Sequence, residues 1–108
     1  MDTALDVFVF PEPWWDLRGQ GVPEAERRQH LLDEARAELG PQHPLATGDL
    51  DVLADLTRQD EVLFRCSEDA FAIVHLTYAG ALDPFVRVRL FDSWSAVRDE
   101  IEAMAEDW

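Results

Sequence analysis

The sequence contains one cysteine, no lysine and no long apolar run, and the shortage of cysteine and of apolar runs each argues against a class of protein. With Cys66 alone, no disulfide can form within the chain, which argues against a disulfide-stabilised secreted scaffold. The apolar runs are only a few residues long, far below the ~20 that a membrane-spanning helix needs. The first residues carry two aspartates and lack the basic and apolar regions of a secretory signal. We therefore expect a soluble, cytoplasmic protein.

The charge balance is strongly acidic. The chain has 23 aspartates and glutamates against nine basic residues, all of them arginine, for a formal net charge of -14. Such a field repels phosphate groups, and neutralisation of phosphates by basic residues is the main source of nucleic-acid affinity. We expect no direct binding of nucleic acid or membrane. A GC-rich genome or a high-salt cytoplasm would also produce an acidic chain without lysine, so the acidity does not define a task.

The length of 108 residues predicts one domain, 1–108, with enough apolar residues for a core. Within it, residues 1–22 are predicted to form an extended arm or edge strand followed by a tryptophan-rich loop. The apolar stretch 5–10 is the candidate strand, because the prolines that follow it end any ladder.

Two segments show the spacing of amphipathic helices. In 23–39, Pro23 suits a first turn and Gly40 a stop. The apolar stripe of this helix comprises Leu31, Leu32, Ala35 and Leu39. A C-terminal helix of roughly 14 residues follows Asp92 or Ser93, either of which can cap its first turn. Its stripe comprises Trp94, Val97, Ile101, Met104 and Trp108.

Between the two helices the apolar period changes to two, which is typical of strands. Strands are expected at 49–56, 61–66, 71–78 and 85–91, separated by turns. The first is predicted to have one face in water, and the last to expose arginines opposite Val86, Val88 and Leu90. The fold class is therefore α+β, an antiparallel meander of about four strands with an N-terminal and a C-terminal helix packed on one face of the sheet.

Residues 37–78 also resemble a pattern found in small bacterial proteins. The segments that carry it are ELGPQHPL, DEVLF and FAIVHLTY, which match a helix end with His-Pro-Leu, a DDVLF-like strand and a VVHLTW-like strand. Glu61 stands where the pattern has a second Asp, and Tyr78 where it has Trp. This family has no established activity, so the resemblance supports the sheet and implies no mechanism.

His75 is the residue whose chemical role the sequence leaves most open, because it interrupts an apolar strand. By period two it shares a face with Phe71, Ile73 and Thr77. A histidine there could act as a base or ligand, but we favour a side chain hydrogen-bonded to a neighbour in a half-buried sheet. Cys66 ends the adjacent strand, and a Cys–His pair would activate the thiol. We favour the alternative that Cys66 is a small apolar residue.

No motif predicts a metal, a cofactor or a catalytic group. His30, His43 and His75 lack the spacing of metal ligands, and the acidic segments do not match a calcium loop. The scattered glycines form no phosphate-binding loop. His43 lies between prolines, where a polar side chain commonly binds backbone groups.

The remaining candidate contacts are two arginines and two tryptophans. Arg87 and Arg89 lie two apart on one strand face and would suit a carboxylate or phosphate, although we favour ion pairs with aspartates on a neighbouring strand. Those aspartates would be Asp51 and Asp55, which have the matching period.

Trp14 and Trp15 follow the prolines, and tryptophan is enriched at interface hot spots. Together with Trp108 they are places to look for a partner, although we favour core packing for them.

Three functional hypotheses remain. The first, which we favour by elimination, is a non-catalytic protein-binding module of the inhibitor, immunity or regulatory type, monomeric or homodimeric, whose acidic surface steers it to a basic protein partner. The second is a small enzyme or ligand-binding domain with a pocket near His75, Cys66 and Arg87. The third is a nucleic-acid mimic that occupies a DNA-binding protein.

Overall fold

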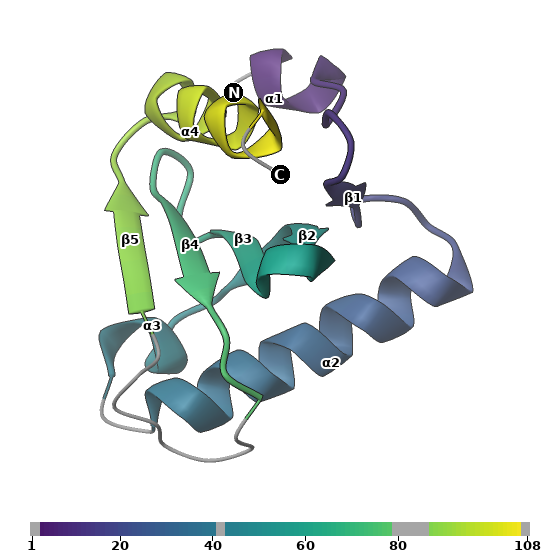
Figure 1. The fold of residues 1–108 in the computed structure, drawn as a ribbon. Helices are drawn as coiled ribbons and strands as arrows, with labels where there is room; N and C mark the ends of the chain where they lie inside the picture. Colours follow the sequence, from purple (N-terminus) through teal and green to yellow (C-terminus); the bar gives the residue numbers. More distant parts are fainter. Residues whose placement is uncertain (1–2, 41–42, 79–86, 107–108) are drawn as a thin grey trace.

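A five-stranded antiparallel sheet forms the middle layer of the protein, and helices cover both of its faces (Figure 1). The computed structural model describes residues 3–40, 43–78 and 87–106. The strands lie in sequence order: β1 (Trp15–Asp16), β2 (Asp51–Leu56), β3 (Glu61–Arg65), β4 (Phe71–His75) and β5 (Arg87–Phe91). The predicted antiparallel meander and α+β class are confirmed. The strand count rises from about four to five because β1 adds a short edge strand.

The two long helices are α2 (Val22–Leu39) and α4 (Trp94–Glu106), close to the predicted ranges. Shorter elements are α1 (Thr3–Val7), α3 (Pro44–Thr47) and the 3-10 helix Thr57–Gln59. The helix α2 ends before Gly40, whose φ of 84° favours glycine. In α4 the Ser93 hydroxyl accepts the Ala96 N–H at 3.2 Å, as expected of a cap. Among the described residues, no helix has the length and apolar character needed to cross a membrane.

The expectation that both helices pack on one face of the sheet is wrong, since α2 and α4 lie on opposite faces (Figure 1). The α4 face buries Leu53, Ala54, Leu56, Leu63, Phe71 and Ile73 against α4 and the N-terminal segment. The α2 face buries Leu50, Val52, Val62, Phe64, Ala72, Val74 and Leu76 against α2. Successive strand residues point to opposite faces, so a strand that is apolar at every position needs a layer on each side.

The N-terminal segment is not the predicted strand at 5–10. It is helical as far as Val7 and then runs without regular structure to β1. The Arg18 guanidinium donates to the carbonyl oxygens of Leu5 and Phe8. These backbone carbonyls thus receive hydrogen bonds from a side chain, where a strand would receive them from the backbone of its neighbour. The Phe8 ring packs edge-on to Trp94 with centroids 5.1 Å apart. The N-terminal segment therefore covers part of the α4 face.

A bulge in β2 overturns the prediction that this strand has one wet face. Val52 pairs with Phe64 and Ala54 with Leu63, so Leu53 is an extra residue without a partner. Because side-chain direction alternates strictly along a strand, one extra residue moves every later side chain to the face opposite the one that a regular strand would give.

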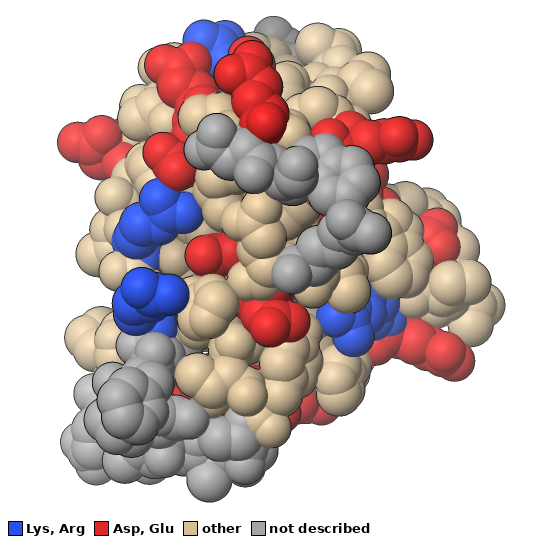
Figure 2. Space-filling model, viewed as in Figure 1, with Lys and Arg blue, Asp and Glu red and all other residues tan. Residues whose placement is uncertain are grey.

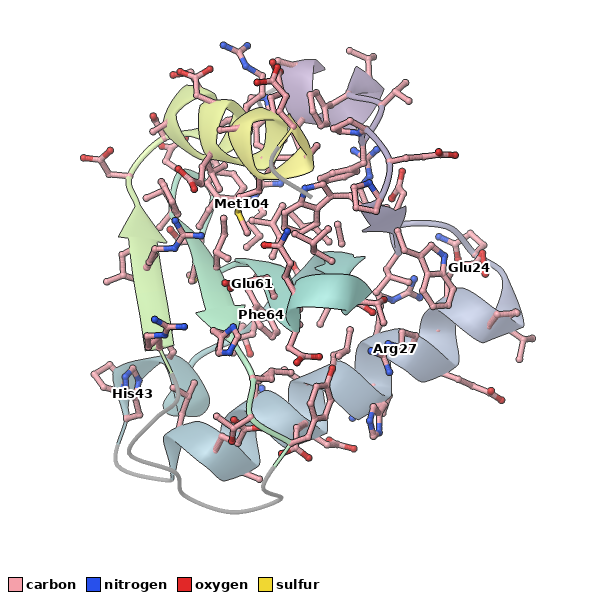
Figure 3. All side chains as sticks on the ribbon, viewed as in Figure 1. Glu24, Arg27, His43, Glu61, Phe64 and Met104 are labelled. Carbon is pink, nitrogen blue, oxygen red and sulfur yellow. The ribbon has the colours of Figure 1, made fainter. Side chains whose placement is uncertain are left out.

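The bulge thus turns Asp55 toward α2, where its side chain is fully buried. Its Oδ2 accepts from Arg27 Nε at 2.9 Å and from the Thr57 hydroxyl at 3.0 Å. Arg27 also donates to the Tyr78 hydroxyl at 3.3 Å. This ion pair ties α2, labelled at Arg27 in Figure 3, to the end of the sheet.

The expected pairing of Asp51 and Asp55 with Arg87 and Arg89 is wrong, because two strands separate β2 from β5. Val86, Trp108 and the connection that precedes β5 lie outside the described residues.

The buried ion pair gives a stability prediction. We expect Arg27→Ala to lower the free energy of unfolding by about 3–5 kcal/mol, because it leaves the Asp55 carboxylate buried without its counter-charge. Urea denaturation followed by circular dichroism measures this. The matched control is Arg98→Ala, which breaks only exposed pairs on α4 and should cost less than about 1 kcal/mol. Equal effects of the two variants would contradict a buried pair.

Candidate functional site

The sequence-predicted contact residues do not form one cluster. His75, Arg87 and Arg89 lie together on β4 and β5, where His75 is the register partner of Arg87. His43, Trp14 and Trp15 lie elsewhere in the fold.

His75 lies in a row of polar side chains across three strands. Glu61 of β3 and Arg87 of β5 are its two register partners. Its Nδ1 is 3.4 Å from the Glu61 Oε1, and the His75 side chain is 30% exposed while that of Glu61 is 14% exposed. Figure 3 labels Glu61 on β3. Glu61 is therefore the polar neighbour of His75, while the hydrogen bond that we expected from the sequence stays a prediction.

Cys66 and His75 do not form a dyad. The Cys66 N–H bonds to the Ala70 carbonyl at 2.8 Å, at the hairpin end of β3 and β4, whereas His75 pairs with Glu61 at the other end. Cys66 also packs against the α2-face cluster. Burial raises the pKa of the Cys66 thiol, which disfavours the reactive thiolate.

The two arginines of β5 have different surroundings. Arg89 Nη1 donates to the Glu100 carboxylate on α4 at 2.8 Å, and its Nη2 lies 3.3 Å from the sulfur of Met104, which Figure 3 labels. Arg87 is exposed and belongs to no ion pair formed among the described residues. Figure 2 shows two separate patches of positive charge where β5 lies.

An apolar groove lies at the end of β5 that leads into α4. It has a volume of about 660 Å³. Its lining comes from α3, the β3–β4 hairpin, β5 and the first turn of α4, and consists of Leu45, Cys66, Ala70, Phe71, Leu90, Phe91, Asp92 and Ala96. The Leu90 side chain beside it is 70% exposed. Sequence reasoning missed this groove, because four separate segments assemble it.

The other three candidates have local roles. His43 Nδ1 accepts the Leu45 N–H at 3.1 Å and caps α3, so it binds the backbone as expected. Trp14 is buried, and its Nε1 donates to the Ile101 carbonyl at 3.2 Å. Trp15 lies on β1, at the opposite edge of the sheet from β5, and is 41% exposed.

Glu38 is a buried carboxylate that sequence reasoning also missed. It lies at the end of α2 and accepts from the Thr77 N–H at 2.6 Å, the Thr77 hydroxyl at 2.9 Å and the Tyr78 N–H at 2.8 Å. Tyr78 has a φ of 59°, in the left-handed region. Burial, together with a hydrogen bond to Glu34, raises the pKa of Glu38. Glu38 thus holds the residues that follow β4 against α2, and it links the segments ELGPQHPL and FAIVHLTY on which the resemblance rests.

Neither a metal centre nor a relative helps to interpret these sites. Among the described side chains, no three His, Cys, Asp or Glu residues are grouped closely enough to hold a metal ion. Comparisons of the chain with family models, with characterised proteins and with solved structures find no match. The function is therefore inferred from the geometry.

Glu38 predicts a pH-dependent stability difference. Because its folded pKa is raised, its contribution to stability is complete below the ordinary pKa of 4.5 and is lost as the pH rises through the folded value. In Glu38→Gln the amide has only one acceptor oxygen, so its NH2 group must face the N–H of either Thr77 or Tyr78. Such a contact between two donors costs about 1 kcal/mol or more. We expect this loss to be largest near pH 4.5 and smaller at neutral pH.

Urea denaturation at both pH values checks this prediction, with the exposed Glu26→Gln on the same helix as control. A loss that grows toward neutral pH would show that the Glu38 pKa is lowered instead.

His75 predicts a coupling energy with Glu61. If the side chain is structural, His75→Ala should destabilise the protein by about 1 kcal/mol, while His30→Ala, exposed on α2, should change stability little. A double-mutant cycle with Glu61→Gln should give a coupling of at least about 0.5 kcal/mol. Unchanged stability of His75→Ala, with lost binding of a partner or ligand, would instead give His75 a functional role.

Proposed function

We propose that the protein is a non-catalytic protein-binding module that binds its partner along β5. We call the binding region the β5 surface: the outer edge of Arg87–Phe91 and the apolar groove at its end. The observation that carries the proposal is Leu90, a large apolar side chain that is 70% exposed beside a groove of about 660 Å³. Exposed apolar surface next to a groove is typical of interaction sites.

The edge of β5 supplies the polar part of this surface. β5 is the last strand of the sheet and pairs only with β4 among the described strands (Figure 1). Its outer side therefore presents N–H and C=O groups that an extended segment of another protein can pair with. Such pairing gives affinity, and the adjacent groove accepts an apolar side chain of the partner.

The opposite edge of the sheet is a poorer binding site. β1 has two residues, Trp15 and Asp16, whereas β5 has five. Short edge strands are one way in which proteins prevent unwanted pairing. β5 is long enough for several ladder hydrogen bonds and lacks this protection.

The charge supports a regulatory or inhibitor-like role. With a net charge of -14, the protein attracts a basic partner over a distance of about 10 Å at ordinary ionic strength. Electrostatic steering of this kind raises the rate of association more than the final affinity. We assign the affinity for the partner to the β5 surface, and the rate of association to the acidic charge.

The placement of the reactive side chains supports a module without catalysis. The Glu61 carboxylate faces the Nδ1 of His75. Cys66 lies at the other end of the hairpin, and its raised pKa disfavours the thiolate. Within the part of the chain that the structure describes, Cys66 and His75 are therefore too far apart to act as nucleophile and base.

The test compares two apolar-to-acidic variants. Leu90→Glu places a charge beside the groove, whereas the control Val22→Glu changes an equally exposed residue at the start of α2. Partners are captured from host lysate with the wild-type protein, and the affinity of the purified partner is then measured for all three proteins. We expect Leu90→Glu to weaken binding about tenfold or more, as for a hot-spot residue, and Val22→Glu to leave it unchanged.

A partner that binds all three proteins equally would show that the β5 surface is not the binding site. Turnover of a metabolite by the purified protein would overturn the proposal that the module is non-catalytic.

A further inference from the structure

We infer that the segment bound by β5 is an extended strand in which acidic residues alternate with apolar ones. This inference rests on the proposed function and specifies the chemistry of the partner segment. It follows from the two faces of β5, from the surroundings of its arginines and from the poor fit of a second copy.

The two faces of β5 have opposite character. Arg87 and Arg89 point to the α4 face, while Val88 and Leu90 point to the α2 face. The side chains of an added strand alternate in the same way, so every second residue of the partner lies beside an arginine. Residues directly opposite each other in an antiparallel pair interact, and opposite charges stabilise the pair. The partner therefore needs acidic residues beside the arginines and apolar residues beside Val88 and Leu90.

Arg87 imposes the stronger preference of the two arginines. The guanidinium of Arg89 is already shared with Glu100 at 2.8 Å and lies against the Met104 sulfur. Arg87 is exposed, and its register partner on β4 is His75, so no carboxylate lies directly beside it within the described sheet. An acidic residue of the partner next to Arg87 thus forms a new ion pair, whereas one next to Arg89 competes with Glu100.

A second copy of the chain fits this edge poorly. If two β5 strands paired antiparallel about their middle residue, Arg89 would lie opposite Arg89, and Arg87 opposite Phe91. Like charges directly opposite each other destabilise a strand pair. The arginines therefore act against self-association, as charged residues on edge strands commonly do.

The surrounding surface limits how many acidic residues the partner carries. Figure 2 shows positive charge along β5 with acidic side chains on the elements around it. A long acidic tract would meet this repulsion beyond the edge, because exposed charges interact over about 10 Å at ordinary ionic strength. The strand that fits best has acidic residues only at the positions beside the arginines.

The probe for the experiment is a displayed library of random ten-residue peptides, selected on the full-length protein and on two charge variants. Arg87→Glu reverses the charge at the proposed contact, and Arg98→Glu makes the same change on the exposed side of α4. We expect peptides selected on the wild type to show acid–apolar alternation. Synthetic peptides from this selection should bind Arg87→Glu at least about fivefold more weakly and Arg98→Glu as well as the wild type.

Several outcomes would overturn the inference. In one, the selected peptides fail to bind Leu90→Glu and yet show no acidic alternation; in another, they bind Arg87→Glu as well as the wild type. Either result would refute the acidic pattern and leave the binding surface in place. Selection of no peptide, or of peptides indifferent to Leu90→Glu, would refute strand binding at β5 and the proposed site with it. A wild-type dimer in sedimentation experiments that Leu90→Glu dissociates would identify the occupant as a second copy.

Discussion

The structure depends on the burial of both faces of the central strands. In β3 the three consecutive residues Val62, Leu63 and Phe64 are fully buried, although they point alternately to the two faces. Each face therefore needs a covering layer, and the chain supplies α2 on one side and α4 with the N-terminal segment on the other. Both faces of the central strands are thereby covered, whereas β5 keeps the exposed side chains of Arg87, Arg89 and Leu90. For this reason the proposed binding surface is placed on β5 and not on the central strands.

Two buried carboxylates then fix how α2 lies on the sheet. Asp55 receives the guanidinium of Arg27, and Glu38 receives the backbone of Thr77 and Tyr78. A buried charge costs several kcal/mol unless it is paired or hydrogen-bonded, so each contact is effective only in the native arrangement. Such contacts define the position of the helix more than they add stability. They also hold the exit of β4, and β4 supports the edge strand β5.

The proposed binding surface combines features from opposite faces of one strand. Leu90 and the groove provide an apolar contact, while Arg87 provides a cation in a protein of net charge -14. In this proposal the apolar contact gives affinity and the charge selects which strand binds, since an unfavourable charge pair excludes a partner and a favourable one attracts it. Under the proposal, Arg87 is therefore the residue that determines specificity.

The sequence alone determined the order of α2, the strands β2 to β5 and α4, the approximate limits of the two long helices and the antiparallel pairing, because apolar period, proline, glycine and caps act within a few residues. It also anticipated the backbone role of His43. It failed for residues 5–10, where packing of Phe8 on Trp94 and carbonyl contacts from Arg18 override the alternation.

Only the tertiary structure decided which face each helix covers, where the carboxylates lie and what surrounds β5. One extra residue, Leu53, reverses the alternation of β2 and buries Asp55, and a period count cannot reveal such a bulge. The separation of Cys66 from His75 follows from hairpin register, and the groove beside Leu90 from four segments that are distant in sequence. Pairing register and long-range packing set these features, so no local stretch of sequence contains them.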